Sequence, residues 1–384
     1  MADGTAGYTL GIEEEYLLVD PETRELAADP PAALLRECEA EVDPEIGAVS
    51  PEFMKAQIEI GTSVCHNMAE ARARLSALRR IVCAAAERHG YRVVAASTHP
   101  SADWHETQHT DKDRYNVLAT DLQGVARRLL ISGMHVHVGV EDPEHRIDVM
   151  NQVSYFLPHL LALSTSSPFW QGHDTGLLSY RLSVFDELPR TGLPERFDSW
   201  GEYCRHVEML VGAGLIEDAS KIWWDVRPSA RFPTVEMRIT DVCPSIDDSL
   251  TVAALYVCLV AMISRLRRDN QRWRVYSNML INENRWRAQR FGTSGGLVDF
   301  GKGEVVPYAD LLEEVIALVM PEAEALGCVD DVLHARTIMA RGTSAHRQRA
   351  ILADAAETGA SDAEARNAVI DWLVTETKAG IGGA

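Results

Sequence analysis

Hydrophobic and polar residues alternate with a period of two in several short stretches, and longer stretches between them show the spacing of helices. The alternation predicts β-strands at residues 8–19, 54–61, 92–97, 132–140, 221–227 and 234–241. The helical spacing predicts helices at residues 68–89, 147–163, 200–213, 250–266, 308–326 and 362–378. Residues 228–233 would join the last two strands as a hairpin. We expect an α+β fold with a largely antiparallel sheet.

The domain organisation follows from what lies between these elements. The 384 residues contain no internal repeat, low-complexity tract or long linker rich in Gly, Ser and Pro. Hydrophobic residues make up 46% of the chain and charged residues 24%, which is typical of a folded protein with a substantial core. We therefore expect a single domain that covers residues 1–384.

The charge of the chain bears on its partners. The net charge is −20 at pH 7, and such a surface repels nucleic acid and anionic lipid, so we expect neither partner. The longest apolar run, residues 252–263, is too short to span a bilayer, and the sequence shows no secretory signal. We expect a cytoplasmic protein, in which an anionic ligand such as ATP needs a local basic pocket or metal ions.

An acidic cluster lies inside the first predicted strand. Alternation places Glu13 and Glu15 on one face of the strand and Glu14 on the other. Glu59 lies in an otherwise apolar strand, and if it joins Glu13 and Glu15, the three oxygen ligands suit Mg²⁺ better than zinc. An edge strand with acidic side chains pointing into solvent would show the same spacing, so both interpretations stay open.

Two histidines share one face of the predicted strand at residues 132–140. His135 and His137 alternate with valine. A His-x-His strand is common in zinc sites, but zinc needs further Cys or His ligands that the sequence does not obviously supply. A pair of hydrogen-bonded core histidines is a second alternative. We favour neutral imidazoles that donate to a phosphate oxygen or complete a Mg²⁺ site.

The predicted hairpin carries alternating charges. Period-two spacing aligns Asp225 with Arg227 and Glu236 with Arg238, and the hairpin could place all four on one face. A salt-bridge ladder is the alternative. Because the residues between them are apolar, the opposite face is predicted to be core, and the charged face must line a cleft or contact water.

A basic cluster follows at residues 284–292. In a helix, Arg287 and Arg290 would be neighbours, and the cluster could supply positive charge for a triphosphate. A solvated helix face fits the same residues. The sequence contains neither G-x-G-x-x-G nor the P-loop pattern, so phosphate binding would not use those loops.

In their order along the chain, these stretches resemble the glutamate–cysteine ligase type 2 family, and within it the bacterial YbdK-like carboxylate–amine ligases. The resemblance runs from about residue 11 to the last predicted helices. Supporting motifs are THP at residues 98–100, RY at 114–115, GMHVHVG at 133–139, SSPFWQG at 166–172, WDVRPS at 224–229 and EMR at 236–238.

The resemblance implies a fold and a set of site residues. The fold is the glutamine-synthetase-like ligase fold, a curved, largely antiparallel sheet with helices packed on its outer face and ATP and Mg²⁺ on its concave face. The implied roles are metal binding by Glu13, Glu15, Glu59 and Glu236, nucleotide contacts from His135, His137, Arg227, Arg287 and Arg290, and catalytic roles for Arg227, Glu236 and Arg238, with Arg238 binding the carboxylate substrate.

The resemblance also implies a reaction. ATP phosphorylates a carboxylate, and an amine attacks the acyl phosphate, with weak activity on glutamate and cysteine that yields γ-glutamylcysteine, ADP and phosphate. Two alternatives remain: a metal-dependent hydrolase that uses His135 and His137, and a nucleotide-binding regulator without turnover. We expect small-molecule acid and amine substrates and a homodimer.

Overall fold

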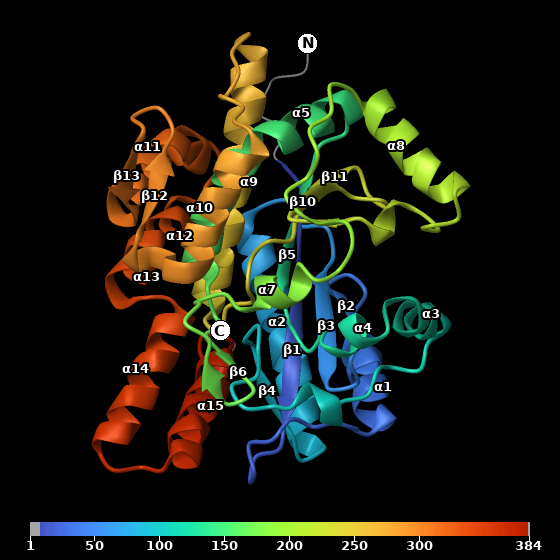
Figure 1. Ribbon diagram of the computed structural model, residues 1–384, viewed down its shortest axis with the longest axis vertical. Coiled ribbons are helices and arrows are strands. Elements are labelled where there is room, and N and C mark those ends of the chain that lie inside the picture. The colour runs from blue at the N-terminus through green and yellow to red at the C-terminus, as the bar shows by residue number, and fades with distance from the viewer. Residues whose placement is uncertain (1–7, 383–384) are drawn as a thin grey trace.

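A twisted antiparallel sheet is the centre of the computed structural model, which describes residues 8–382 (Figure 1). Within these residues the main sheet has seven strands: six follow the order β10-β11-β5-β1-β3-β2, and β4 pairs with residues 17–19 of β1, past the residues of β1 that pair with β5. Each pair in this sheet is antiparallel. The strands are β1 (Leu10–Val19), β2 (Gly47–Pro51), β3 (Gln57–Thr62), β4 (Arg92–Val94), β5 (Met134–Gly139), β10 (Val226–Pro228) and β11 (Thr234–Met237).

Most of the long helices cover one face of this sheet. Figure 1 shows α9, α10 and α11 on the left of the sheet, and the shorter helices α3 and α4 on the right. The helices are α1 (Ala32–Glu41), α2 (Met68–Arg88), α3 (Asp113–Leu122), α4 (Gly124–Arg127), α5 (Pro143–Val153), α6 (Leu157–Ser164), α7 (Arg181–Phe185), α8 (Trp200–Gly212), α9 (Ile246–Arg268), α10 (Asn278–Phe291), α11 (Tyr308–Leu326), α12 (Val329–Leu333), α13 (Ala335–Arg341), α14 (Ser344–Glu357) and α15 (Asp362–Lys378). Three small two-stranded sheets complete the fold: β6 (Phe169–Trp170) with β7 (His173–Asp174), β8 (Thr191–Gly192) with β9 (Trp223–Trp224), and β12 (Gly296–Asp299) with β13 (Glu304–Pro307).

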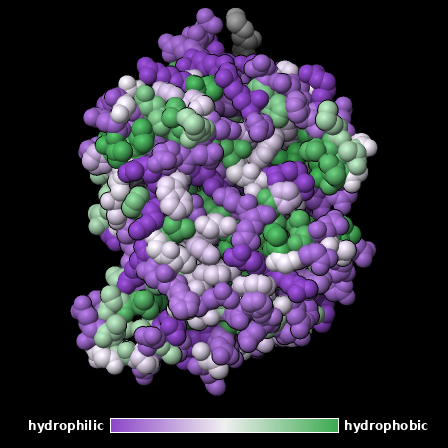
Figure 2. All heavy atoms as spheres, in the orientation of Figure 1, coloured by the Kyte–Doolittle hydropathy of each residue, from purple (hydrophilic) through white to green (hydrophobic). Residues whose placement is uncertain are grey.

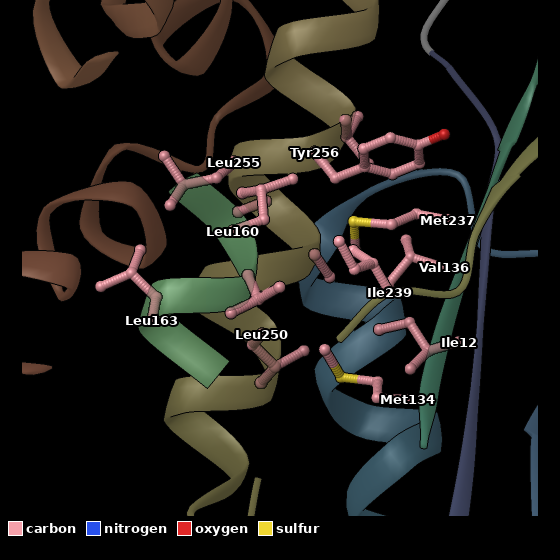
Figure 3. Close-up of a cluster of buried hydrophobic side chains, with 14 of the residues drawn as sticks. Ile12, Met134, Val136, Leu160, Leu163, Met237, Ile239, Leu250, Leu255 and Tyr256 are labelled. Carbon is pink, nitrogen blue, oxygen red and sulfur yellow. The ribbon is translucent and has the colours of Figure 1, made fainter. Parts of the chain in front are cut away.

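The core forms where the apolar face of the sheet meets α9. Figure 3 shows Ile12, Val136 and Met237, from three neighbouring strands, pointing toward Leu250 and Tyr256 of α9. All five side chains are fully buried. Because side chains alternate across a strand, burial of these residues turns their immediate neighbours in sequence toward the opposite face of the sheet.

One charged residue of the first strand lies on the core side. Glu14 is fully buried and accepts hydrogen bonds from Arg79 Nε at 2.8 Å, from Arg79 Nη2 at 2.6 Å and from Ser249 Oγ at 2.6 Å. The Tyr16 hydroxyl also donates to Glu14. Arg79 also donates hydrogen bonds to the carbonyl oxygens of residues 243 and 244. This satisfied ion pair ties β1 to α2 and to the start of α9.

The helix α9 illustrates a long apolar segment inside a folded protein. By length and composition this one helix of the described chain could cross a membrane, but 89% of its most apolar window is buried inside the protein. Its flanking charges are Asp247 and Asp248 at the start and Arg265, Arg267 and Arg268 at the end, which complement the helix dipole. The burial is that of a core helix.

His99, in the THP motif, is a buried structural residue. Its Nδ1 accepts from the backbone N–H groups of Ser101 at 3.2 Å and Ala102 at 3.0 Å, and its Nε2 donates to the Arg24 carbonyl at 3.1 Å. Burial lowers the pKa of His99 to about 4, against a smaller opposing effect of the hydrogen bond to Arg24. A second proton on Nδ1 would face two N–H donors, so the ring is held neutral.

The predicted α+β class and the antiparallel sheet are confirmed, but several boundaries differ. The strand expected at residues 221–227 is interrupted at Asp225, between β9 and β10, and the strand expected at 234–241 ends at Met237. The helix expected at 147–163 is divided by a 3₁₀ turn at Ser154–Phe156 into α5 and α6. The prediction omitted β2, which pairs with β3 and supplies part of the floor of the cavity described next.

Candidate functional site

The face of the sheet opposite the core lines a cavity of about 520 Å³. Its floor consists of side chains from β1, β2, β3, β5, β10 and β11, and its walls come from residues 114–131, from α7 and the residues after it, and from the loop at residues 229–232. Figure 2, in the orientation of Figure 1, shows that the face toward the viewer is mostly hydrophilic, with separate hydrophobic groups. The cavity gathers most of the residues that the motifs indicated.

Strand pairing brings the predicted acidic and imidazole side chains together. In the sheet register Glu13 lies opposite His135, Glu15 opposite Glu59, and His137 opposite Glu236. All six side chains line the cavity. The alternation argument for Glu13, Glu14 and Glu15 therefore predicted the correct faces, because Glu14 is the member that packs into the core.

These side chains form groups with the spacing of metal ligands. Potential ligand atoms of Glu15, Glu52 and Glu59 lie within 4.8 Å of one another, and the same holds for Glu13, His137 and Glu236, and for Glu13, Glu59 and His135. The first group offers only oxygen atoms, as Mg²⁺ prefers, whereas the other two mix oxygen with imidazole nitrogen. Glu52 precedes the third strand and was not singled out by the sequence pattern.

Glu236 is held between two arginines. Arg227 donates from Nε to Glu236 Oε2 at 2.9 Å and from Nη2 to Oε1 at 3.1 Å, and Arg238 Nη1 donates to Oε1. Burial would raise the pKa of Glu236, but Arg238 and Arg227 together hold it well below its usual range. Arg238 Nη1 also lies 3.4 Å from His135 Nδ1. The two arginines thus keep this carboxylate ionised beside the histidines.

The histidines share Glu13. Its Oε2 lies 3.2 Å from His135 Nδ1, and its Oε1 lies 3.4 Å from His137 Nε2. Burial opposes ionisation of Glu13, yet hydrogen bonds from both rings hold its pKa well below the usual range. For His135, burial and the nearby Arg238 charge lower the pKa. For His137, burial is outweighed by the hydrogen bond to Glu13 and the charge of Glu236, so its pKa is raised.

In the oxygen-only group, the pKa values of two carboxyl groups are raised, whereas those of Glu13 and Glu236 are lowered. Burial and the charge of Glu15 raise the pKa of Glu52 to about 7. Burial and the charges of Glu52, Glu13 and Glu15 raise the pKa of Glu59 well above its usual range. Carboxylates crowded in this way repel one another unless a proton or a cation lies between them.

Several buried polar atoms in this part of the described chain have no protein partner. They are His135 Nε2, Arg238 Nε and Arg181 Nε. Buried polar groups usually pair with protein, water or a ligand, so these atoms and the crowded carboxylates fit a site for a cation together with an anionic ligand. The residues present therefore fit Mg²⁺ and the phosphates of a nucleotide.

The basic cluster of α10 lies elsewhere. Arg287 and Arg290 are not among the residues that line the cavity; Arg287 Nε donates to the Gly296 carbonyl at 2.6 Å, and both guanidinium groups stack on Phe291. Arg285 forms ion pairs with Asp225 and with residue 186 at 2.7 Å. Asp225 therefore does not share a face with Arg227, because the chain is irregular between β9 and β10.

Other cavity residues carried no clear sequence signal. Arg181, Arg114 and Lys221 line the cavity together with Glu52. Of these, only Arg114 belonged to a motif that carried the family resemblance, and no role followed from it. Each of these residues lies outside a predicted alternating strand or at the end of one, where the spacing does not predict which way the side chain points. Only the packed fold brings them to the sheet.

The fold is that of known amide-forming ligases. Glutamate–cysteine ligase from Francisella tularensis, in complex with AMP, superposes with a TM-score of 0.68 at 13% identity, over 98% of this chain and 90% of that chain. A bifunctional glutathione synthetase from Pasteurella multocida gives a TM-score of 0.66 at 16% identity, over 97% of this chain and 53% of that chain. The architecture is therefore the glutamine-synthetase-like carboxylate–amine ligase fold.

Sequence comparison gives the family. The model of glutamate–cysteine ligase family 2 (GCS2) matches residues 9–367, and the chain belongs to this family. A protein from Rhodospirillum rubrum with the provisional name glutamate–cysteine ligase 2 is 61% identical over 376 residues, covering 98% of this chain and 97% of the relative. A protein of the same provisional name from Jannaschia sp. is 56% identical over 369 residues, covering 96% of each chain. The chain is an ATP-dependent carboxylate–amine ligase.

Proposed function

We propose that this protein transfers the γ-phosphoryl group of ATP to a substrate carboxylate in the presence of Mg²⁺, and that an amine then attacks the acyl phosphate to form an amide. In the first step a carboxylate oxygen bonds to the γ-phosphorus, and the bond from the γ-phosphorus to the oxygen that bridges the β- and γ-phosphates breaks, which releases ADP. In the second step the amine nitrogen bonds to the carbonyl carbon and inorganic phosphate leaves with the C–O bond electrons, while the amine gives up a proton.

The observation that carries this proposal is the crowded, oxygen-only group of Glu15, Glu52 and Glu59. Its repulsion is relieved by a hard divalent cation, and Glu13 and Glu236 extend the acidic floor beside it. Mg²⁺ bound there would neutralise charge on the phosphates.

The basic side chains of the cavity take complementary roles. Arg227, His135 and His137 are proposed to contact phosphate oxygens, since each lines the cavity and His135 Nε2 has no hydrogen-bond partner among the described residues. Arg238 is proposed to hold the substrate carboxylate next to the γ-phosphate, with its orientation fixed by Glu236. Arg287 and Arg290 have no part in this proposal, because they lie outside the cavity lining.

The name of the relatives supports glutamate and cysteine as one substrate pair, and we propose that the protein uses this pair slowly. We also propose that residues 1–384 form one catalytic domain and that the protein acts as a cytoplasmic homodimer. Mass determination in solution tests the dimer, and localisation of a tagged chain tests the compartment.

The reaction is tested by its products. Purified protein, Mg²⁺ and ATP are combined with a panel of amino acids and amines, and ADP, AMP and phosphate are measured separately. Hydroxylamine replaces the amine in a parallel panel, where it should trap the acyl phosphate as a hydroxamate. Glu15→Gln should abolish ADP release, while the exposed Glu39→Gln, a change of the same kind on α1, should not.

Three results would contradict the proposal. AMP formed in proportion to amide, without ADP above background, indicates an adenylate instead of an acyl phosphate. Hydrolysis that needs tightly bound zinc and no ATP indicates a metal-dependent hydrolase. Tight ATP binding without turnover across the whole panel indicates a nucleotide-binding regulator.

A further inference from the structure

We propose that one organic substrate of this ligase carries a large apolar group close to its reacting carboxyl or amino group, and that an apolar wall at one end of the cavity binds it. The apolar wall consists of Phe53, Leu118, Leu129, Ile131, Phe185 and Leu188. This inference rests on the proposed function and names the substrate class that the same cavity accepts.

The apolar wall comes from several separate segments of the chain. Phe53 and Ile131 lie beside the sheet, Leu118 is on α3, and Phe185 and Leu188 are on α7 and just after it. Phe53, Ile131, Phe185 and Leu188 are buried within the protein, whereas Leu118 and Leu129 are half-buried. These six side chains bind apolar surface, while Arg114 and Tyr115 of α3, which also line the cavity, add a charge and a hydroxyl group beside them.

The apolar wall lies at one end of the cavity floor. Ile131 precedes β5, whereas Phe232 lies beyond its other end, where Val140 pairs with the carbonyl of residue 233. The two ends are separated by the length of the strand, roughly 20 Å at about 3.3 Å per residue. The histidines and the acidic groups lie between them, so each end is adjacent to the reacting centre but distant from the other.

The opposite end has the features of a nucleotide site. Phe232 is 56% exposed and forms a T-shaped pair with His137, with 6.2 Å between ring centroids, so the exposed part of its ring is open for a base to stack on. Arg231, next to Phe232 in the chain, lines the cavity at this end. At this end arginine side chains can bind the phosphates and the exposed aromatic ring can stack on the base. The apolar wall at the other end is then available to the acid or the amine.

A positive charge lies at the boundary between the apolar wall and the floor. Arg181 is buried, stacks on Phe185 at 5.4 Å, and donates from Nη1 and Nη2 to the carbonyl oxygens of Ile239 and Arg238 at 3.2 and 3.1 Å. Within residues 8–382 no carboxylate oxygen lies within 4.0 Å of its guanidinium group. A substrate with a carboxylate beside its apolar group would fit both features.

The test is a substrate series in which only apolar size changes. In one arm, glycine, alanine, norvaline and norleucine serve as the amine with glutamate as the acid. In the other arm, straight-chain carboxylic acids of increasing length serve as the acid with hydroxylamine. In the arm that uses the apolar wall, kcat/KM should rise about fourfold for each buried methylene until the wall is covered. The arm that responds identifies whether the apolar substrate enters as acid or as amine.

Matched variants connect this preference to the apolar wall. Leu118→Gln should lower kcat/KM for the longest substrate about tenfold and flatten the series, with the KM for ATP unchanged. Val117→Gln is the control, since Val117 neighbours Leu118 on α3 but is 46% exposed and does not line the cavity. Leu129→Gln, also half-buried, gives a second variant if Leu118→Gln does not fold.

The outcomes separate this inference from the proposed function. ADP release with no dependence on chain length in either arm, or a KM for ATP that rises in Leu118→Gln, would overturn the apolar site while leaving the ligase reaction intact. Thermal shift of the parent and Leu118→Gln with the same compounds tests binding even without turnover. Stabilisation that grows with chain length only in the parent supports the apolar wall, and equal stabilisation in both proteins refutes it.

Discussion

Glu59→Gln should make the metal-free protein more stable at pH 8 and at the same time remove most of its stabilisation by Mg²⁺. Glu59 lies within 4.8 Å of both Glu15 and Glu52, counted between their nearest potential ligand atoms. Glutamine keeps the shape of the side chain and removes one of the charges that repel one another. The variant therefore loses repulsion in the absence of metal and loses a ligand in its presence.

The scale of the effect is taken from Glu52, a neighbouring buried carboxyl of the same group. Its pKa of about 7 lies about 2.5 units above the ordinary value of 4.5, and each unit corresponds to about 1.4 kcal/mol. For a raised carboxyl pKa, the folded state binds more protons than the unfolded state between pH 4.5 and 7. Stability from this group is therefore present below pH 4.5 and lost as the pH rises through about 7. Burial and the charges of Glu52, Glu13 and Glu15 raise the pKa of Glu59 in the same direction, so its own ionisation at pH 8 costs stability, and Glu59→Gln should remove a cost of about 1–3 kcal/mol.

The assay is urea unfolding of the parent and the variant, with EDTA or with millimolar Mg²⁺, at pH 6 and pH 8. We expect the variant to exceed the parent in unfolding free energy with EDTA at pH 8, by less at pH 6, and to gain little from Mg²⁺. Glu39→Gln on the exposed side of α1 is the control and should match the parent throughout. A variant that is less stable than the parent in EDTA, or that responds equally to Mg²⁺, would refute the assignment of this carboxylate group.

Three further predictions test other parts of the molecule. Arg238→Lys should raise the KM for the acid substrate much more than the KM for ATP, because lysine cannot present a planar fork to a carboxylate; equal changes would move this residue to the phosphate site. The pKa of His99, about 4, lies below its value of about 6.5 in the unfolded chain, so the stability that this residue contributes is complete above pH 6.5 and falls as the pH drops toward 4. In His99→Gln the unfolding free energy measured with urea should therefore fall by about 2 kcal/mol less between pH 8 and pH 5 than it does in the parent. Arg79→Met should destabilise the fold by about 3–5 kcal/mol by leaving Glu14 buried without its partner, and combining it with Glu14→Gln should recover part of that loss; no recovery in the double variant would contradict the ion-pair explanation.

Strand periodicity was sufficient for the part of the site that lies on regular strands. Glu13 and Glu15 face the cavity, Glu14 faces the core, and His135 and His137 share the cavity face. In each case alternate residues of a central strand must go to opposite sides of the sheet, and the apolar neighbours determine which side is core. The antiparallel sheet itself followed from the same pattern and from the hairpin.

The remaining site residues depend on tertiary packing. Glu52 follows β2, a strand that the pattern did not reveal, and reaches the carboxylates only because β2 pairs with β3. Asp225 departs from simple alternation because the chain between β9 and β10 turns its side chain toward Arg285. Arg287 and Arg290 satisfied helical spacing, but spacing on a surface helix says nothing about which distant cavity the helix faces.

The ion pair beneath the first strand affects how this protein folds during synthesis. Glu14 emerges from the ribosome early during synthesis. Ser249, whose hydroxyl donates to Glu14 at 2.6 Å, follows 235 residues later. Until α9 has been translated and has packed, the ion pair of Glu14 with Arg79 lacks the hydroxyl of Ser249 and the carbonyl groups of residues 243 and 244 that complete its hydrogen bonds. The site is therefore expected to assemble late, and a nascent chain stalled before residue 249 should bind no Mg²⁺ through these residues, however long it is given to fold.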